Sequence, residues 1–288
     1  MTTADILKKV HELEITSKRL TNHLFTGEYH TAFKGRGMSF KEVREYAPGD
    51  DPRFIDWNVS ARMGHTFSKV FEEERELTVY LLVDVSASSL FGTFRQTKKG
   101  LITEMCAVLA FSAISNNDKV GLIFFSDHVE KFIPAKKGRD HVLYMVREML
   151  TFTSQCAKTD VLKALTFLNN TTRHKSIVFV LSDFADAGYQ DALRVAARRH
   201  DVIGVQVYDR RDEQLPEAGL MQLRDAETGR IVLLNTNDPY TRFKYSQQFL
   251  KIMEDAKVAF RKAGADLLQV STGQDYVKVL QQFFIRRA

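Results

Sequence analysis

Only two cysteines, Cys106 and Cys156, occur in the 288-residue chain. They form neither a Cys-x-x-Cys pair nor another metal-ligand spacing, so a disulfide scaffold is excluded and a reducing compartment fits the composition. Cys106 lies in an apolar helical stretch, where we expect it to pack as a small hydrophobic side chain.

Long hydrophobic runs are also missing. No apolar stretch approaches the ~20 residues that span a bilayer, and residues 1–20 alternate charged and apolar side chains instead of forming the apolar centre of a signal peptide. With only five prolines and fifteen glycines, and no low-complexity segment, we expect disorder at the termini alone. These absences predict a cytoplasmic protein without a membrane partner.

A clustered basic face is the third feature that the sequence lacks. The net charge is +5 and the pI about 9.1, but the basic pairs are scattered. They are Lys136-Lys137, Arg198-Arg199, Arg210-Arg211 and Arg286-Arg287. Nucleic-acid binding calls for basic residues gathered on one face, so we expect solvated surface charge and no nucleic-acid partner.

What the sequence does contain is a regular alternation of strand and helix patterns. Apolar runs typical of buried strands occupy residues 77–83, 119–126, 176–181, 202–207 and 266–270. Helical patterns occupy residues 95–115, 141–150, 160–168, 189–199, 240–263 and 276–284. Shorter hairpin strands are expected at 129–133, 219–223 and 230–234. The alternation predicts an α/β fold with a doubly wound, mostly parallel sheet, in which ligands bind at the carboxyl ends of the strands.

The first 75 residues follow a different pattern. Residues 4–22 have a helical period, and residues 27–62 are rich in turn formers and charges, typical of loop with short elements. We therefore divide the chain into an N-terminal extension, residues 1–75, packing on an α/β domain, residues 76–288. Within the extension, acidic residues such as Asp50 and Asp51 either form a second polar site or pair with Arg44, Arg53 and Arg62, and pairing is the preferred interpretation. Trp57 is expected to anchor this layer in the core.

Oxygen-bearing side chains follow the strands at one predicted edge of the sheet. The strand at 77–83 continues into Asp84-x-Ser86-x-Ser88, the strand at 176–181 ends near Asp183, and Thr159 precedes a helix between them. Individually, Thr159 would be a good helix N-cap and Asp183 an ordinary turn residue. Together they offer the hydroxyl and carboxylate oxygens that a hard dication such as Mg²⁺ prefers. Asp127-His128, at another strand end, is expected to be a satisfied turn pair.

These five residues resemble the metal-ion-dependent adhesion site of von Willebrand factor A domains, which have a Rossmann-like fold. The resemblance implies that Ser86, Ser88 and Thr159 contact the metal directly and that Asp84 and Asp183 hold it mainly through water. It also implies that an acidic residue of a protein partner completes the coordination. Mg²⁺ is the expected ion, with Mn²⁺ or Ca²⁺ as substitutes.

A narrower resemblance covers nearly the whole chain. The chain is similar to the fifty-eighth of the catalogued domains of unknown function, a prokaryotic group with a von Willebrand A-like core. The matching residues are Arg44-x-Tyr46-x-x-Gly49-Asp50-Asp51-x-Arg53-x-Ile55-Asp56-Trp57 with Ala61-Arg62, the hairpin Leu223 to Gly229, and Ser271 to Tyr276. The resemblance implies an adaptor that works beside a MoxR-type AAA+ ATPase in chaperone-like or complex-maturation tasks.

Enzymatic alternatives lack their motifs. The sequence contains neither a Gly-x-x-x-x-Gly-Lys-Ser/Thr phosphate loop nor a Gly-x-Ser-x-Gly elbow, and we expect no catalysis. The best rival is a Mg²⁺-dependent phosphohydrolase of the haloacid dehalogenase type, which needs a second acid where Ser86 stands. A phospho-receiver domain would need an acid pair near the first strand's aspartate, and residues 72–74 lie too early for it.

Overall fold

The computed structural model describes residues 5, 8, 10–16, 39–72, 77–93, 96–154 and 156–287. The chain forms two compact units, one of residues 33–77 and one of residues 1–32 together with 78–288. We call them the small unit and the core unit. That residues 1–75 pack as one layer on the α/β domain stays a prediction.

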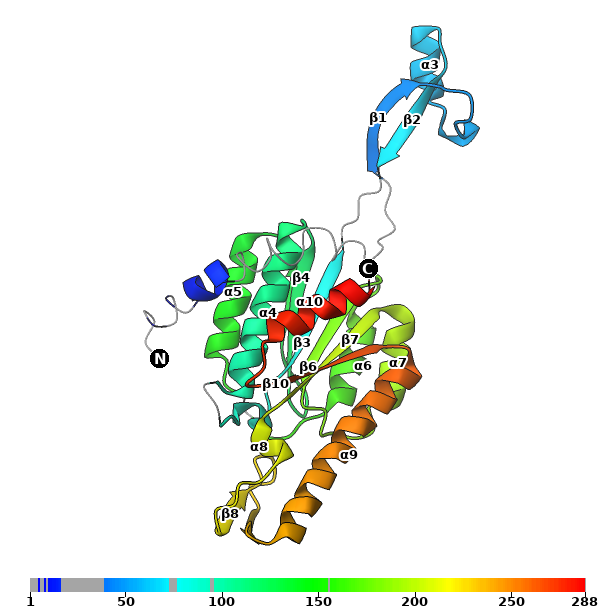
Figure 1. The fold of residues 1–288 in the computed structure, drawn as a ribbon. Coiled ribbons are helices and arrows are strands. Elements are labelled where there is room, and N and C mark those ends of the chain that lie inside the picture. The colour runs from blue at the N-terminus through cyan, green and yellow to red at the C-terminus, as the bar shows by residue number, and fades with distance from the viewer. Residues whose placement is uncertain are drawn as a thin grey trace. The chain divides into compact units, whose positions relative to one another are not determined.

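The core unit is built on a six-stranded sheet with the order β10-β7-β6-β3-β4-β5 (Figure 1). The strands are β3 (Thr78–Asp84), β4 (Lys119–Phe125), β5 (Val129–Lys136), β6 (Ile177–Ser182), β7 (Asp201–Tyr208) and β10 (Asp266–Ser271). Neighbouring strands run parallel except for β5, which is antiparallel to β4. The predicted α/β fold with a mostly parallel sheet is confirmed.

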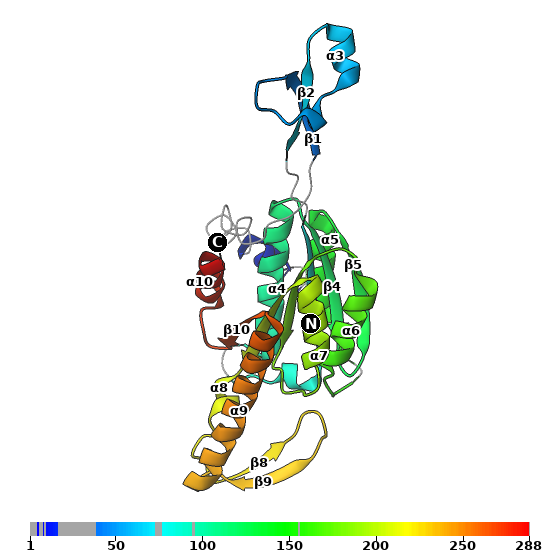
Figure 2. The same ribbon diagram turned by 90° about the vertical axis from the view of Figure 1, so that its right-hand side faces the viewer.

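Helices cover both faces of this sheet, which explains why its central strands are apolar along their whole length. One face carries α4 (Lys98–Ser115), α5 (Arg139–Thr151) and α10 (Tyr276–Arg287), and the other carries α6 (Val161–Thr171), α7 (Gln190–Arg199) and α9 (Pro239–Ala263) (Figures 1 and 2). Short helices follow two strands, η2 (Ala87–Leu90) after β3 and α8 (Arg210–Glu213) after β7. Cys106 in α4 is fully buried among apolar side chains, as expected.

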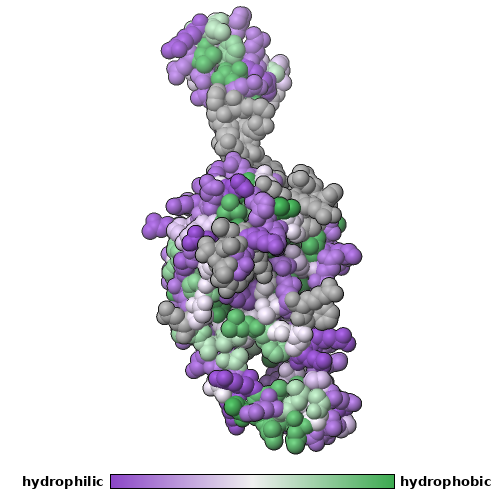
Figure 3. All heavy atoms as spheres, turned by 90° about the vertical axis from the view of Figure 1, so that its left-hand side faces the viewer, coloured by the Kyte–Doolittle hydropathy of each residue, from purple (hydrophilic) through white to green (hydrophobic). Residues whose placement is uncertain are grey.

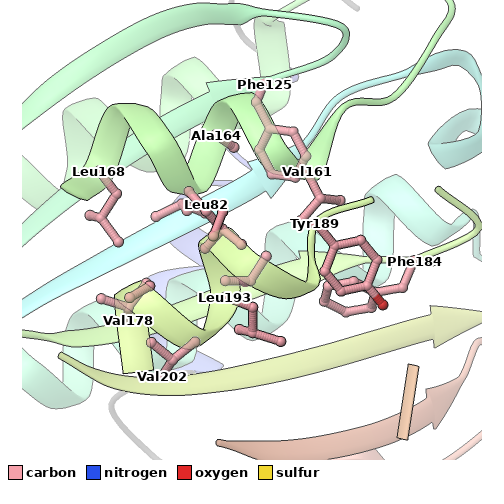
Figure 4. Packing of buried hydrophobic residues seen from close by; sticks show 14 of the residues in the cluster. Leu82, Phe125, Val161, Ala164, Leu168, Val178, Phe184, Tyr189, Leu193 and Val202 are labelled. Atoms are coloured by element: carbon pink, nitrogen blue, oxygen red, sulfur yellow. The ribbon is translucent and has the colours of Figure 1, made fainter. Parts of the chain in front are cut away.

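The face under α6, α7 and α9 holds a continuous apolar core (Figure 4). Leu82 and Val178 of the sheet meet Leu168 of α6 and Leu193 of α7, and all four are completely buried. Burying one such side chain contributes about 1.5–3 kcal/mol. The core fixes the strands in register and so fixes the positions of the loops at their ends.

Gly204, in the middle of β7, packs closely against this core. A Cβ atom added there would lie 2.5 Å from the Phe260 ring of α9 and 2.7 Å from Leu267 Cδ1. We therefore expect Gly204→Ala to lower the free energy of unfolding by about 1–3 kcal/mol through overpacking, measured by urea denaturation. Gly100→Ala is the control, because its Cβ would meet the flexible Gln96 side chain and alanine favours the helix. Equal stability of Gly204→Ala and wild type would contradict this packing.

A separate hairpin precedes α9. Its strands, β8 (Leu220–Arg224) and β9 (Ile231–Asn235), pair antiparallel with Leu220 opposite Asn235. The hairpin predicted at 219–223 and 230–234 is thereby confirmed. Most of its side chains are exposed, including Leu220 and Leu233, at 70% and 66%.

The small unit contains more regular structure than the expected loop layer. An antiparallel pair, β1 (Ser39–Glu45) and β2 (Phe67–Glu72), frames η1 (Pro52–Phe54) and α3 (Trp57–Met63). Two of the expected arginine–acid pairs form, Arg44 with Asp50 at 2.7 Å and Arg53 with Asp51 at 2.6 Å. Asp56 instead caps α3 and pairs with Lys69 at 3.5 Å.

The expectation for Trp57 is wrong. Its side chain is 71% exposed, because it opens α3, a helix without a buried residue. Among the described residues 42–70 only Ser68 is buried. A small unit buries a low fraction of its surface, and the described part of this one leaves Trp57 exposed.

Part of the N-terminal segment contacts the core unit. Residues 10–16 are helical, within the helix predicted for 4–22. Val10 and Leu13 are buried, and the buried Glu14 carboxylate accepts a hydrogen bond from Arg139 Nη2 at 2.8 Å. The turn-rich stretch at 27–37 and the acidic residues 73 and 74 lie outside the described residues. Within the described ranges, no helix combines the length and apolar character needed to cross a membrane.

Candidate metal centre

The topology of the sheet brings two predicted site residues to its switch point. From β3 the chain passes through α4 to β4 on one side, and β6 later enters on the other side of β3. Val83 pairs with Leu181, so Asp84 emerges beside Ser182 and one residue from Asp183. Ligand sites of doubly wound sheets lie at this position.

Hydrogen bonds join the three loops that carry the predicted residues. The Ser182 hydroxyl donates to Asp84 Oδ2 at 2.6 Å, which ties the end of β6 to the end of β3. Ala87 N donates to the Ala157 carbonyl at 3.1 Å. Val161 N donates to Asp186 Oδ2 at 3.0 Å, which closes the ring between the Thr159 loop and the Asp183 loop. The three stretches therefore converge at one place.

Asp84 is the buried acid at the centre of this place, only 3% exposed. Burial, together with the negative charge of Asp183, raises the pKa of Asp84 to about 7. Hydrogen bonds from Ser182 and from Ser86 N, at 2.9 Å, oppose the rise without cancelling it. Two carboxylates this close disfavour each other's ionised form, and a cation between them would remove the conflict.

Asp209, at the end of β7, shows what a satisfied buried carboxylate looks like in the same fold. Burial alone would raise its pKa, but hydrogen bonds from the Thr272 and Thr93 hydroxyls and from Arg211 N lower it to about 2. Asp209 thus has a structural role. Asp84 lacks such compensation, and a strongly perturbed acid at a strand end is typical of a functional site.

The two serines after Asp84 have a spacing that suits a small dication. Ser86 Oγ and Ser88 Oγ lie 3.1 Å apart. Neighbouring ligands of an octahedral Mg²⁺ ion, with Mg–O distances of about 2.1 Å, lie about 3.0 Å apart. The two hydroxyls are within hydrogen-bond distance of each other. The spacing fits the proposed ligands.

Thr159 does not have the capping role that its position suggested. The N-cap of α6 is Asp160, whose side chain accepts a hydrogen bond from Lys163 N at 2.9 Å. Thr159 Oγ1 is buried and makes no hydrogen bond of normal length, although it lies close enough to the Glu227 carboxyl to lower the pKa of that acid. Burying a hydroxyl that lacks a hydrogen-bond partner lowers stability by about 1–3 kcal/mol. Coordination of a metal ion by Thr159 Oγ1 would offset this loss.

Asp183 is held at the edge by the chain on both sides of it. Its carbonyl accepts a hydrogen bond from Gln206 Nε2 at 2.9 Å. The next residue, Phe184, has φ of 52°, a left-handed conformation that is uncommon for a bulky residue. Phe184 is buried against Tyr189 and Phe260, and this packing stabilises the sharp turn after Asp183.

Lys98 is the site residue that the sequence did not reveal. It is 5% exposed, and its ammonium lies 3.3 Å from Asp183 Oδ2 and 2.8 Å from Asp212 Oδ2. Lysine at the first position of a helix opposes the helix dipole, which is a signal that could have marked it. Lys98 balances part of the acidic charge at the edge.

Asp127 and His128 form the expected turn pair, with His128 Nδ1 2.6 Å from Asp127 Oδ1. The thiol of Cys156 lies in the same group, and one ligand atom from each residue falls within 4.8 Å of the others. Asp127 hydrogen-bonds the thiol and raises the pKa of Cys156. The mutual contacts of these three side chains account for the cluster.

A cleft opens next to Asp183. It has a volume of about 210 Å³ and lies between the ends of β6 and β7 and the side of α9. Lys98 and Asp212 line one side, while Phe249 and Ile252 of α9 line the other. The candidate centre therefore adjoins a partly apolar recess that can receive side chains.

An α/β protein with a mostly parallel sheet and oxygen-bearing side chains at its switch point is the class that this fold and site define. Residues 42–254 match the family model described as "Protein of unknown function DUF58". The chain belongs to the DUF58 family. It is 31% identical over 278 residues, 96% of its length, to "Uncharacterized protein Rv1480" of Mycobacterium tuberculosis, of which it covers 87%. "Uncharacterized protein YeaD" of Bacillus subtilis is 29% identical over 107 residues, 37% of this chain and 25% of that protein.

Solved structures are similar at low sequence identity. The chain aligns with the protein described as BatB from Bacteroides thetaiotaomicron at 15% identity and a TM-score of 0.49, covering 73% of this chain and 98% of that one. A von Willebrand factor type A protein from Catenulispora acidiphila aligns at 10% identity and a TM-score of 0.38, covering 88% of this chain and 50% of that one.

Proposed function

We propose that the protein is a non-catalytic, metal-dependent adaptor that binds another protein through the candidate centre. The observation that carries this proposal is the convergence of the buried Asp84 and the half-buried Asp183, whose negative charges oppose each other without a full compensating charge. Ser86, Ser88 and Thr159 would supply neutral oxygens, and the two aspartates would supply the negative charge. A bound dication, Mg²⁺ or its substitutes Mn²⁺ and Ca²⁺, would attract a carboxylate of the partner.

Apolar surface near the centre supports protein binding. Exposed apolar side chains gather on the β8–β9 hairpin and on the first turns of α9 (Figure 3). They are Leu220, Ile231, Leu233, Tyr240 and Phe243, each more than half exposed. Exposed apolar patches of this kind mark interaction sites in soluble proteins, and α9, whose first turns carry part of the patch, also lines the cleft beside Asp183.

We propose a MoxR-type AAA+ ATPase as the partner, acting in chaperone-like or complex-maturation work in the cytoplasm. The support is the family resemblance carried by the Arg44 to Trp57 motif and by the hairpin at 223–229. The haloacid dehalogenase type of phosphohydrolase is the rival. It needs a second acid two residues after Asp84, where the Ser86 hydroxyl instead hydrogen-bonds Ser88.

The adaptor proposal is tested by measuring binding to a purified MoxR-type ATPase of the same organism at constant Mg²⁺, by biolayer interferometry. We expect Asp183→Ala to weaken binding at least about tenfold because one charged metal partner is lost. The control is Asp191→Ala on α7, whose side chain is 88% exposed, and it should bind like wild type. Equal binding by all three would contradict the proposal. Mg²⁺-dependent phosphatase activity that disappears in Asp183→Ala but persists in Asp191→Ala would favour the rival.

A further inference from the structure

The turn of the β8–β9 hairpin lies at the same edge of the sheet as the candidate centre. Figure 2 shows the hairpin running beneath the carboxyl ends of the strands, with its turn close to the loops there. Its base is fixed, since Thr236 N donates to the Gly219 carbonyl at 2.8 Å and Arg242 Nη1 donates to the Thr236 carbonyl at 2.6 Å. The base of the hairpin is therefore anchored to the first turns of α9.

Within the turn, one acid has a structural role and the other does not. Asp225 Oδ1 accepts hydrogen bonds from Glu227 N at 2.9 Å and from Thr228 N at 3.1 Å, and Gly229 closes the turn with φ of 70°. The Asp225 carboxylate thus stabilises the turn through hydrogen bonds to its backbone. The side chain of Glu227 takes no part in this capping.

Glu227 is half-buried, although Asp225, Ala226 and Thr228 beside it are exposed. A tip residue of an exposed hairpin loses its exposure only where the tip meets something else. Burial raises the pKa of Glu227, the Thr159 hydroxyl lowers it, and the negative charges of Asp183, Asp225 and Asp186 raise it again. The groups that act on this carboxyl therefore include two of the five predicted site residues.

This juxtaposition is unfavourable without a cation. Glu227 adds a carboxylate to a place that already holds Asp183 beside Asp84, and like charges oppose each other's ionisation. The nearby Lys98 ammonium is already shared between Asp183 and Asp212. Thr159 Oγ1 is buried and faces this carboxyl, close enough to lower its pKa, but makes no hydrogen bond of normal length. One cation contacting Thr159 and Glu227 together would satisfy both groups.

We propose that Glu227 is an intramolecular ligand of the candidate metal centre, presented by the hairpin turn at the position that a partner's acidic side chain would otherwise take. The inference rests on the proposed metal-dependent function. It assigns a role to the 223–229 motif, and it means that a partner carboxylate must displace Glu227 to bind. The hairpin then carries both the internal ligand and the exposed apolar surface that a partner would contact.

The test is isothermal titration of the whole chain with Mg²⁺ alone. We expect Glu227→Gln to weaken Mg²⁺ binding at least about tenfold, because an anionic ligand is lost. Glu227→Asp keeps the charge on a shorter side chain and should recover part of the affinity. The matched control is Glu254→Gln, an exposed carboxyl on α9, which should bind like wild type. Asp84→Asn should not bind.

Hydrogen exchange gives a second readout that does not depend on affinity. Mg²⁺ should slow amide exchange at residues 225–230 in wild type and in Glu254→Gln, and should leave it unchanged in Glu227→Gln. If Glu227→Gln binds Mg²⁺ as wild type does and its turn is protected equally, Glu227 is not a ligand, while the loss of binding in Asp84→Asn keeps the adaptor proposal intact. If wild type and Asp84→Asn give equal heats, the metal centre and the role of Glu227 fail together.

Discussion

Replacing Asp84 by asparagine is expected to abolish Mg²⁺ binding and, in metal-free buffer at pH 8, to make the folded protein more stable than wild type. Both effects follow from the same burial. Asp84 is 3% exposed and faces Asp183, so its ionised form is costly until a cation compensates it. Asparagine keeps the shape and removes the charge.

The pH dependence has a definite sign. The pKa of Asp84 is about 7 in the folded protein against 3.8 in the unfolded chain, so between these values the folded state binds a proton that the unfolded state lacks. Metal-free wild type should therefore lose stability as pH rises from about 4 to 7. The loss is at most about 4 kcal/mol, at 1.36 kcal/mol per pKa unit, and Asp84→Asn should lack this slope.

Asp209→Asn provides the opposite control. Its folded pKa of about 2 lies below the unfolded value of 3.8, so its ionised form stabilises the protein above pH 4 and this contribution is lost as pH falls through 2. Removing the Asp209 charge by Asp209→Asn should therefore lower the free energy of unfolding at pH 8. The measurement is urea denaturation of wild type, Asp84→Asn and Asp209→Asn with a chelator at several pH values. It gives the free energy of unfolding of each protein as a function of pH. A wild type whose stability is flat between pH 4 and 7 would contradict the assignment for Asp84.

Lys98→Met is expected to cost about 3–5 kcal/mol of stability in metal-free protein. Burial favours the neutral form of Lys98, but the charges of Asp183 and Asp212 outweigh it and keep the pKa of the ammonium above its usual value. Removing this cation leaves two carboxylates at the edge without compensation, and breaking a buried ion pair has a cost of this size. The free energy of unfolding from urea melts measures it.

Mg²⁺ should restore more stability to Lys98→Met than it adds to wild type, since the ion then supplies beside Asp183 the positive charge that Lys98 no longer provides. Lys257→Met, an exposed position on α9, is the control and should lie within about 0.5 kcal/mol of wild type. A loss below about 1 kcal/mol in Lys98→Met would show that Lys98 does not carry the charge balance of the edge.

The strands and the first half of the site could be predicted from local sequence because burial imposes a local pattern. The run at 77–83 is apolar on both faces, which only a covered parallel strand requires, and Asp84 is polar because the strand ends there. The position of Asp183 follows from the rule that parallel strands end at one edge, whereas Thr159 precedes a helix and is placed at that edge by the polar loop before it. Their use as metal ligands remains a prediction.

Other parts of the site depend on contacts between distant residues and leave little local trace. Lys98 looks like a surface lysine until Asp183 and Asp212 meet it, 85 and 114 positions later. Gln206 sits in an apolar strand, where its hydrogen bond to the Asp183 carbonyl explains a polar residue only after folding. The expectation for Trp57 fails because a lone large aromatic usually indicates a core, whereas within residues 42–70 the structure shows only Ser68 buried.

Ser39 faces Glu72 at the base of the small unit. Strand partners lie about 5 Å apart, so the two ends of the segment from Ser39 to Glu72 are adjacent. A two-residue turn could span that gap, and the 32 positions between these residues could be excised or exchanged for another module with neighbouring ends. Because β1 and β2 pair only with each other, such an exchange would leave the strand order of the six-stranded sheet unchanged.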